Sequence, residues 1–205
     1  MSRRKLVIVS NLYPLPWEPG RASFNRQQFA LLESEYELSV LVPVNFIDWF
    51  RHIRKISQSD RVRYAPYFFM PKIGRRFYAV FMFLSLLLHS GFWLKKRAPD
   101  VMLASWAYPD AVAASWLASL FGCKFYFKVH GSDIHMHGLE AARAVQIKRA
   151  AKTASAIISV SEELKAQMVS LGIDGAKVRV IYNGVDHALF SATYQRKIDK
   201  PYMLF

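Results

Sequence analysis

Short runs of β-branched and aromatic residues alternate with longer segments of helical character along almost the whole chain. Such an alternation is typical of a parallel β-sheet whose strands are joined by helices that cover its faces. We place strands at 5–10, 37–43, 64–70, 100–104, 124–129, 155–160 and 177–182, and helices at 23–34, 75–97, 109–121, 138–153 and 161–171. The sequence therefore predicts an α/β fold, with a parallel sheet and helices on both faces.

Several of these helix ends have a chemical cause. Pro99 ends the second helix, because proline has no amide hydrogen and disfavours helical geometry in the residue before it. Ser159 or Ser161 can cap the amino-terminal end of the last helix with its hydroxyl. Gly172 is a usual helix stop at the other end of that helix.

The chain has 205 residues, of which 53% are hydrophobic, and one cysteine, Cys123. This length suits one well-cored main domain. A single cysteine cannot form an internal disulfide, and His135 and His137 lack Cys or carboxylate partners at metal spacing, so we predict a reducing compartment and no metal site. The apolar segment 6–9 is too short for a signal-peptide core of roughly 7–15 residues. We expect a cytoplasmic protein.

The formal net charge is +13, which favours an anionic partner such as nucleic acid, anionic lipid or a phosphorylated substrate. Between residues 51 and 76 there are eight Lys or Arg residues against one acid, Asp60. Nucleic-acid binding usually interleaves basic and aromatic residues on one exposed face, whereas this cluster lies beside an apolar segment. The pattern favours an anionic membrane surface, contacted through residues 51–97, and no nucleic acid.

Residues 77–94 form an apolar segment without a formal charge, with basic residues on both sides. A membrane-spanning helix needs about twenty such residues, and a span here would put the flanking strands on opposite sides of a bilayer. Two other interpretations keep a single sheet. The helix is either buried in the core, or has one side in the core and the other on an anionic membrane surface.

The strand-like run 125–129 stops at His130 and Gly131. In open α/β sheets, ligands bind beyond the carboxyl ends of the strands, so polar residues placed there can face a substrate. His130 is either a hydrogen-bond donor or proton carrier for that substrate, or a histidine that the backbone satisfies at a strand end. Gly131 allows a ligand to approach closely, because it has no side chain.

The loop 11–23, after the first strand, is expected at the same edge of the sheet. Gly20 lets backbone amides approach a phosphate, with help from Arg21 and the start of the next helix. The spacing is not that of the dinucleotide-binding glycine fingerprint. Gly20 can equally be a turn glycine among three prolines.

A third loop at this edge follows the strand 100–104 and carries Trp106, Tyr108 and Asp110. The faces of Trp and Tyr rings commonly stack on sugars. Asp110 either binds hydroxyl groups or occupies the first turn of the next helix, where a negative charge is favourable. The sequence leaves the functional and the structural interpretation open.

Four motifs, taken in order, resemble the amino-terminal half of retaining glycosyltransferases of family 4, which have the GT-B fold. They are the Pro/Gly loop 14–20, Trp106-Ala107-Tyr108-Pro109-Asp110-Ala111-Val112-Ala113, Val129-His130-Gly131-Ser132-Asp133, and Val180-Ile181-Tyr182-Asn183-Gly184-Val185-Asp186. Each motif is weak alone, and their order and spacing over nearly the whole chain carry the resemblance. In that family two Rossmann-like domains face each other across a cleft, and the first mainly receives the acceptor.

The resemblance implies a role for each motif residue. The implied catalytic residue is His130, beside the donor sugar or the leaving phosphate. The implied donor-binding residues are Gly20, Arg21 and Gly131; the implied acceptor-binding residues are Trp106, Tyr108, Asp110 and Asp133; the implied hinge residues are Asn183, Gly184 and Asp186. The donor is a nucleotide-diphosphate sugar of UDP or GDP type, and no cofactor is bound permanently.

The chain departs from the family pattern in two ways. Its first loop has one glycine, Gly20, where many members have two. It also lacks the carboxy-terminal domain, which contains the basic phosphate-binding pair and the Glu-x7-Glu motif. Residues 201–205 resemble the first strand of that domain. We therefore expect residues 1–186 to form a Rossmann-like acceptor-binding domain, and 187–205 to be a linker and the start of a donor-binding domain.

The resulting hypothesis is the acceptor-binding domain of a glycosyltransferase of hexosyltransferase type, peripheral to the inner face of the plasma membrane. The full enzyme would transfer a sugar, with retention, to a lipid-linked or polysaccharide acceptor in cell-surface polysaccharide biosynthesis, and residues 1–205 alone would be inactive. One alternative is a basic module that binds a membrane surface or nucleic acid without catalysis. Another is a GT-B-like sugar-nucleotide epimerase, whose expected acidic and histidine catalytic residues are not evident.

Overall fold

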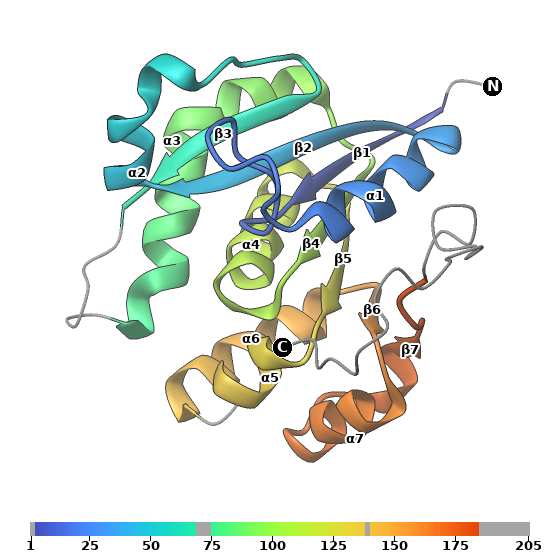
Figure 1. The fold of residues 1–205 in the computed structure, drawn as a ribbon. Coiled ribbons are helices and arrows are strands. Elements are labelled where there is room, and N and C mark those ends of the chain that lie inside the picture. Colours follow the sequence, from blue (N-terminus) through green and yellow to red (C-terminus); the bar gives the residue numbers. More distant parts are fainter. Residues whose placement is uncertain (1–2, 69–74, 138–139, 185–205) are drawn as a thin grey trace, which may run out of the picture.

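The computed structural model of the chain describes residues 3–68, 75–137 and 140–184. In this part of the chain, parallel strands form one seven-stranded sheet in the order β3-β2-β1-β4-β5-β6-β7, and helices cover both faces (Figure 1). The strands are β1 (Arg4–Val9), β2 (Tyr36–Asn45), β3 (Val62–Tyr67), β4 (Val101–Ser105), β5 (Lys124–Val129), β6 (Ala156–Ser159) and β7 (Val178–Val180). The predicted α/β fold is confirmed.

The helices are α1 (Ser23–Leu31), α2 (Phe46–Arg51), α3 (Tyr78–Arg97), α4 (Val112–Phe121), α5 (Ser132–His137), α6 (Ala141–Thr153) and α7 (Glu162–Ser170). Short 3₁₀ turns lie at Leu32–Ser34, Ile53–Lys55, Arg75–Phe77 and Gly175–Lys177, and a π-type turn lies at Ala107–Ala111. The predicted helix over 109–121 therefore begins three residues later, because this turn precedes it.

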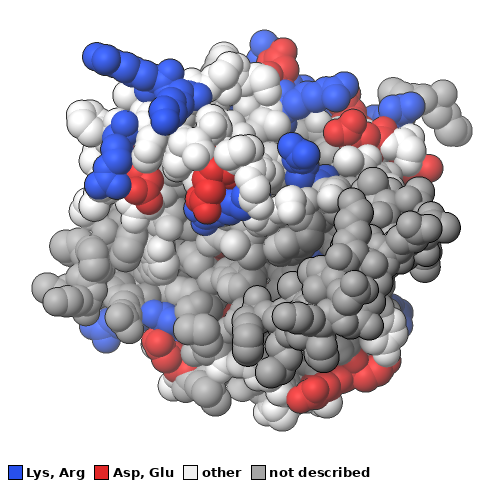
Figure 2. Space-filling model, in the orientation of Figure 1, with Lys and Arg blue, Asp and Glu red and all other residues white. Residues whose placement is uncertain are grey.

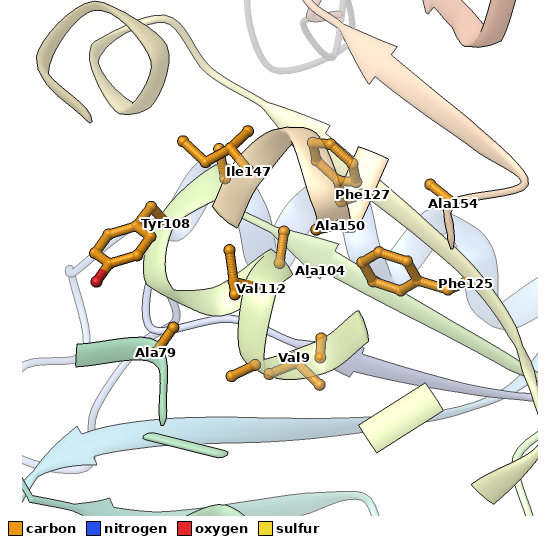
Figure 3. Close-up of a cluster of buried hydrophobic side chains, with 14 of the residues drawn as sticks. Val9, Ala79, Ala104, Tyr108, Val112, Phe125, Phe127, Ile147, Ala150 and Ala154 are labelled. Carbon is orange, nitrogen blue, oxygen red and sulfur yellow. The ribbon is translucent and has the colours of Figure 1, made fainter. Parts of the chain in front are cut away.

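The strands at the centre of the sheet are buried on both faces, as is usual for parallel strands between helices. In β1, Leu6 and Ile8 pack with Phe29 of α1 on one face. Val7 and Val9 point to the larger core on the other face, because successive side chains of a strand alternate. Figure 3 shows part of this larger core, where side chains from the sheet, α4 and α6 pack together.

The ends of the helices follow the predicted chemistry. The Ser161 hydroxyl accepts a hydrogen bond from the Leu164 backbone N–H at 3.1 Å, so Ser161 rather than Ser159 caps α7. Gly172 follows α7 with φ +80°, a backbone conformation that is unfavourable for residues with a side chain. Two short helices, α2 and α5, were not predicted, because six residues are too few to show a helical period.

Helix α3 has one side in the core and the other on the surface. Met82 and Leu86 are buried against the neighbouring strand and helix, whereas Leu88 and Phe92 are 88% and 84% exposed. By length and composition α3 could cross a membrane. Its packing against β3 and α4 instead matches the interpretation in which one side is core, and contact of the other side with a membrane stays a prediction.

Several expectations lie outside the described residues. These are the linker over 187–200, the strand-like end at 201–205, the hinge residue Asp186 and the last residues of the strand expected at 64–70. The division into a domain and a linker therefore stays a proposal.

Candidate functional site

The loops after β1, β4 and β5 meet at one edge of the sheet, because these three strands are neighbours. Hydrogen bonds join the loops directly. The Asn11 backbone N–H donates to the Asp110 carboxylate at 2.6 Å, and the Ala107 N–H donates to the Asp133 carboxylate at 2.9 Å. The sequence prediction that these loops converge is confirmed.

His130 lies directly after β5, half-buried between two aromatic rings. Trp106 stacks on the imidazole with 5.9 Å between ring centroids, and Phe24 of α1 meets it edge-on at 5.8 Å. Burial, and then the charge of Lys128, lower the pKa of His130 from 6.5 to about 4. At neutral pH the ring is therefore uncharged, with one nitrogen as a donor and the other as an acceptor.

Buried polar side chains next to His130 define which nitrogen carries the hydrogen. Asn25 donates from Nδ2 to the Leu12 carbonyl at 2.9 Å, so its Oδ1 faces Ser105 and accepts from the Ser105 hydroxyl at 3.3 Å. Ser105 Oγ also lies 2.9 Å from His130 Nε2. Since the hydroxyl has one hydrogen, this network assigns Nε2 as the donor to Ser105 and leaves Nδ1 as a hydrogen-bond acceptor.

Asp133 holds the loop in which His130 lies. Its carboxylate is fully buried and accepts hydrogen bonds from the backbone N–H groups of His130 at 3.0 Å, Gly131 at 2.9 Å and Ala107 at 2.9 Å. Burial raises the pKa of Asp133, while these backbone groups lower it. Asp133 as it lies thus orders two loops of the site and does not face an acceptor.

Gly131 has φ +116°, a conformation that is strained for any residue with a side chain. An added Cβ would meet its nearest atom, in His135, at an ordinary 3.9 Å. The conformation of the turn, rather than crowding, therefore requires glycine here.

Tyr108 and Asp110 are also fully buried, so neither presents a surface for an acceptor as the chain lies. The Arg143 guanidinium stacks on the Tyr108 ring at 5.1 Å from its centroid. Asp110 accepts from Asn11 through Oδ1, whereas its Oδ2 is buried without a hydrogen-bond partner in the described residues. Burial is the main cause that raises the pKa of Asp110 to about 7.

The raised pKa of Asp110 predicts a pH-dependent difference between the protein and its Asp110→Asn variant. A folded-state pKa above the unfolded value of about 3.9 means that the neutral carboxyl stabilises the fold fully below pH 4, and that this stability is lost as the pH rises to 7. Relative to the variant, the free energy of unfolding should fall by about 4 kcal/mol over this range. Urea unfolding of both proteins from pH 4 to pH 8 measures it.

The difference between the two proteins is needed because His130 titrates in the opposite sense. Its lowered pKa makes stability fall as the pH drops from 6.5 towards 4. Both proteins share this contribution, so it cancels in the difference. An unfolding difference that stays constant from pH 4 to pH 8 would contradict the Asp110 prediction.

The first loop is held by its own residues. Arg21 donates to the Asn11 carbonyl at 3.2 Å and lies 3.9 Å from Glu18. Gly20 is exposed, and a Cβ added there would meet nothing within 4 Å. The structure therefore holds Arg21 against the start of the first loop, and it shows no steric need for glycine at position 20.

Asn183, a predicted hinge residue, is hydrogen-bonded to the strand that leads to His130. Lys128 of β5 donates to Gln28 at 2.6 Å and to Asn183 at 2.8 Å, and Gln28 donates to Asn183 at 3.1 Å. Gly184 is exposed beside it. Burial lowers the pKa of Lys128.

The sequence analysis missed Asn25, Ser105, Lys128 and Gln28 as residues of this region. One signal was present, since Ser105 ends a strand just before Trp106. The other three depend on which side of α1 faces β5, and a single sequence does not give that. Among the residues that the structure describes, no group of three or more His, Cys, Asp or Glu side chains could hold a metal ion.

The sequence model of Glycosyltransferase Family 4 matches residues 30–189 of this chain. The match includes β4, β5, His130 and Asn183, although it begins after the first loop. The curated proteins include no significant match to the chain.

Solved structures of low sequence identity share the fold. Sucrose-phosphate synthase from Thermosynechococcus elongatus has a TM-score of 0.64 and 12% identity, over 91% of this chain and 50% of that one. Anabaena HepE in complex with UDP has a TM-score of 0.58 and 14% identity, over 91% and 46%. The UDP-GlcNAc 2-epimerase from Methanocaldococcus jannaschii has a TM-score of 0.56 and 14% identity, over 87% and 45%.

The chain thus spans about half the length of the solved structures that it matches. The GT-B neighbours are glycosyltransferases and epimerases alike, so the fold alone does not separate these activities. The family match covers most of the chain and does separate them. The chain belongs to glycosyltransferase family 4.

Proposed function

We propose that residues 1–186 are the acceptor-binding domain of a retaining, hexosyltransferase-type glycosyltransferase, and that 187–205 lead into a donor-binding domain. The full enzyme takes a sugar from a nucleotide-diphosphate donor and passes it to a lipid-linked or polysaccharide acceptor in cell-surface polysaccharide biosynthesis. The reaction takes place on the cytoplasmic side of the plasma membrane. The family match supports the transferase class, and the neighbour solved with UDP supports a nucleotide-sugar donor.

The observation that most supports this proposal is the state of His130. Its imidazole is uncharged, lies where three loops meet, and is hydrogen-bonded through Nε2 to the Ser105 hydroxyl. A charged imidazole would attract the leaving diphosphate. An uncharged ring with Nδ1 as an acceptor instead suits a hydroxyl group of a sugar. We therefore assign His130 to orient a sugar hydroxyl in the reacting complex, with Trp106 as a stacking surface beside it.

Stabilisation of the diphosphate leaving group is then the task of other groups. Negative charge develops there as the sugar departs, and fixed donors aimed at it lower the barrier. In this chain Arg21 and the backbone of the first loop are the candidates, since they lie at the same edge of the sheet. The remaining donors are expected in the donor-binding domain.

A transfer assay tests the proposal. The 205-residue chain, and a longer chain in which it continues through a donor-binding domain, are each incubated with UDP- and GDP-sugars and a membrane extract as the source of acceptors. We expect transfer of labelled sugar by the longer chain and none by residues 1–205. Conversion of the UDP-sugar to its 2-epimer without an acceptor would show an epimerase and overturn the proposal, as would comparable transfer by residues 1–205 alone.

A further inference from the structure

Exposed apolar side chains gather on one part of the molecule, formed by α2, the end of β3 and α3. Those that are large and exposed there are Phe46, Ile47, Phe50, Ile53, Phe68, Phe77, Leu84, Leu88 and Phe92. We call these residues the α2–α3 surface. Water-exposed apolar groups of this number on neighbouring elements mark an interaction site more often than chance exposure does.

The α2–α3 surface is continuous rather than a set of separate side chains. The rings of Phe46 and Phe50 stack with 6.4 Å between centroids, and Phe68 meets Phe81 of α3 edge-on at 6.2 Å. A shallow hollow of about 280 Å³ connects the three elements; it is lined by Phe46, Pro66, Phe68, Ser85, Leu88 and His89. Along α3, Leu84, Leu88 and Phe92 follow at intervals of four residues and so share one side of the helix.

Exposed basic side chains follow α2 and end α3, the two helices of this surface. Arg54 and Lys55 are exposed after α2, and Lys95 and Lys96 are exposed at the end of α3. None of these four has an acidic partner within ion-pair distance in the described part of the chain, and α3 contains no acidic residue. In Figure 2, Lys and Arg side chains gather over the corner where Figure 1 shows α2.

An apolar face with a basic border has the chemistry of a surface that lies on a bilayer of anionic phospholipids. The apolar side chains enter the boundary between headgroups and acyl chains, while Lys and Arg attract the negative headgroups. Nucleic acid offers no apolar interior in which leucine and isoleucine side chains could be buried. We propose that the α2–α3 surface docks the protein on an anionic membrane, with α3 lying along the bilayer surface and not crossing it.

The position of this surface explains how a docked protein would receive its acceptor, a step that rests on the proposed function. Helix α2 follows β2 at the carboxyl edge of the sheet, where the candidate site lies. The first loop contacts the elements beside this surface: Trp17 stacks at 4.4 Å on His52, which directly follows α2, and the Tyr64 hydroxyl of β3 donates to the Pro14 carbonyl at 3.2 Å. A lipid-linked acceptor could therefore reach the site from the bilayer without leaving it.

Vesicle flotation with the 205-residue chain tests the docking directly and involves no sugar transfer, so its failure is distinct from failure of the proposed function. The probes are vesicles of phosphatidylcholine alone and of phosphatidylcholine with phosphatidylglycerol. We expect the protein to float with the anionic vesicles, with a partition coefficient about tenfold or more above that for the neutral ones.

Two pairs of variants assign this binding to the α2–α3 surface. The double variant Leu88→Gln and Phe92→Gln should lower partitioning to anionic vesicles about tenfold. The matched control is Leu31→Gln with Leu120→Gln, whose leucines are 77% and 58% exposed on other helices. This control should stay within about twofold of the parent, because Leu31 of α1 and Leu120 of α4 lie outside the α2–α3 surface. Circular dichroism confirms that both variants are folded.

A second comparison separates specific charges from total charge. Arg54, Lys55, Lys95 and Lys96 are replaced together by Gln, and the control replaces Lys124, Arg149, Lys152 and Arg179, which are exposed elsewhere. Only the first set should remove the preference for anionic vesicles.

Three results would overturn the docking proposal. They are flotation with neither type of vesicle, equal losses in the variants and their controls, and a self-associated protein that Leu88→Gln with Phe92→Gln converts to a monomer. The last result would show that a second copy of the chain covers the surface. In the first case, binding to duplex DNA would assign the basic side chains to nucleic acid instead.

Discussion

Replacing His130 with Ala in the longer, two-domain chain is expected to lower kcat/KM for sugar transfer about a hundredfold. The imidazole is held in place by Trp106, Phe24 and Ser105, so its acceptor nitrogen is fixed before a substrate arrives. Loss of one fixed polar group that orients or stabilises the reacting atoms typically costs 10²–10³ in rate. Initial rates with saturating and limiting donor measure the effect on kcat and on KM.

The variant His130→Asn is the informative control. Asparagine Oδ1 can occupy roughly the place of Nδ1 and still accepts a hydrogen bond. We expect His130→Asn to keep more activity than His130→Ala, which would not follow if the ring served only to carry a proton. Equal activity in the parent enzyme and His130→Ala would remove His130 from the site.

Replacing Asp133 with Ala should lower the free energy of unfolding by about 3–5 kcal/mol. The substitution leaves three backbone N–H groups without an acceptor, the buried one of Ala107 and the partly buried ones of His130 and Gly131. Each unsatisfied buried donor costs about 1–3 kcal/mol, while removal of a buried charge gives part of this back. Urea unfolding of the 205-residue chain at pH 7 measures the change.

Two other variants serve as controls for the Asp133→Ala measurement. Asp133→Asn keeps one oxygen as an acceptor and should cost less than Asp133→Ala. Glu35→Ala removes an exposed carboxylate that makes no ion pair in the described residues, and it should change stability by no more than about 0.5 kcal/mol. If Asp133→Ala were as stable as Glu35→Ala, the loops would not depend on this carboxylate.

The order of strands and helices could be predicted because the sheet is parallel. Strands buried on both faces are continuous apolar runs, such as 6–9 in β1, and the helices between them are long enough to show a period. The short helices α2 and α5 escaped prediction for the opposite reason. The neighbours of each strand were also beyond a single sequence, since pairing of β1 with β4 joins segments about ninety residues apart.

The meeting of the three loops could be predicted, but the hydrogen bonds of Asp110 and Asp133 could not. A strand end followed by His130 indicates an edge where ligands bind. Whether Asp110 and Asp133 face a ligand or the backbone depends on the conformation of the loops, and in the structure both accept backbone N–H groups. The resemblance that gave them acceptor contacts carried residue types and not side-chain directions.

The ring contact between Trp17 and His52 couples the first loop energetically to the residue that follows α2. Residues in contact show non-additive effects in double-mutant cycles, whereas sites more than about 7–10 Å apart usually add. Substitutions in α2 and in the first loop should therefore not be treated as separate. The exposed side of α3 has no such contact with the loop among the described ring pairs. It is the place at which the affinity for a surface can be changed by engineering while the geometry around His130 is left intact.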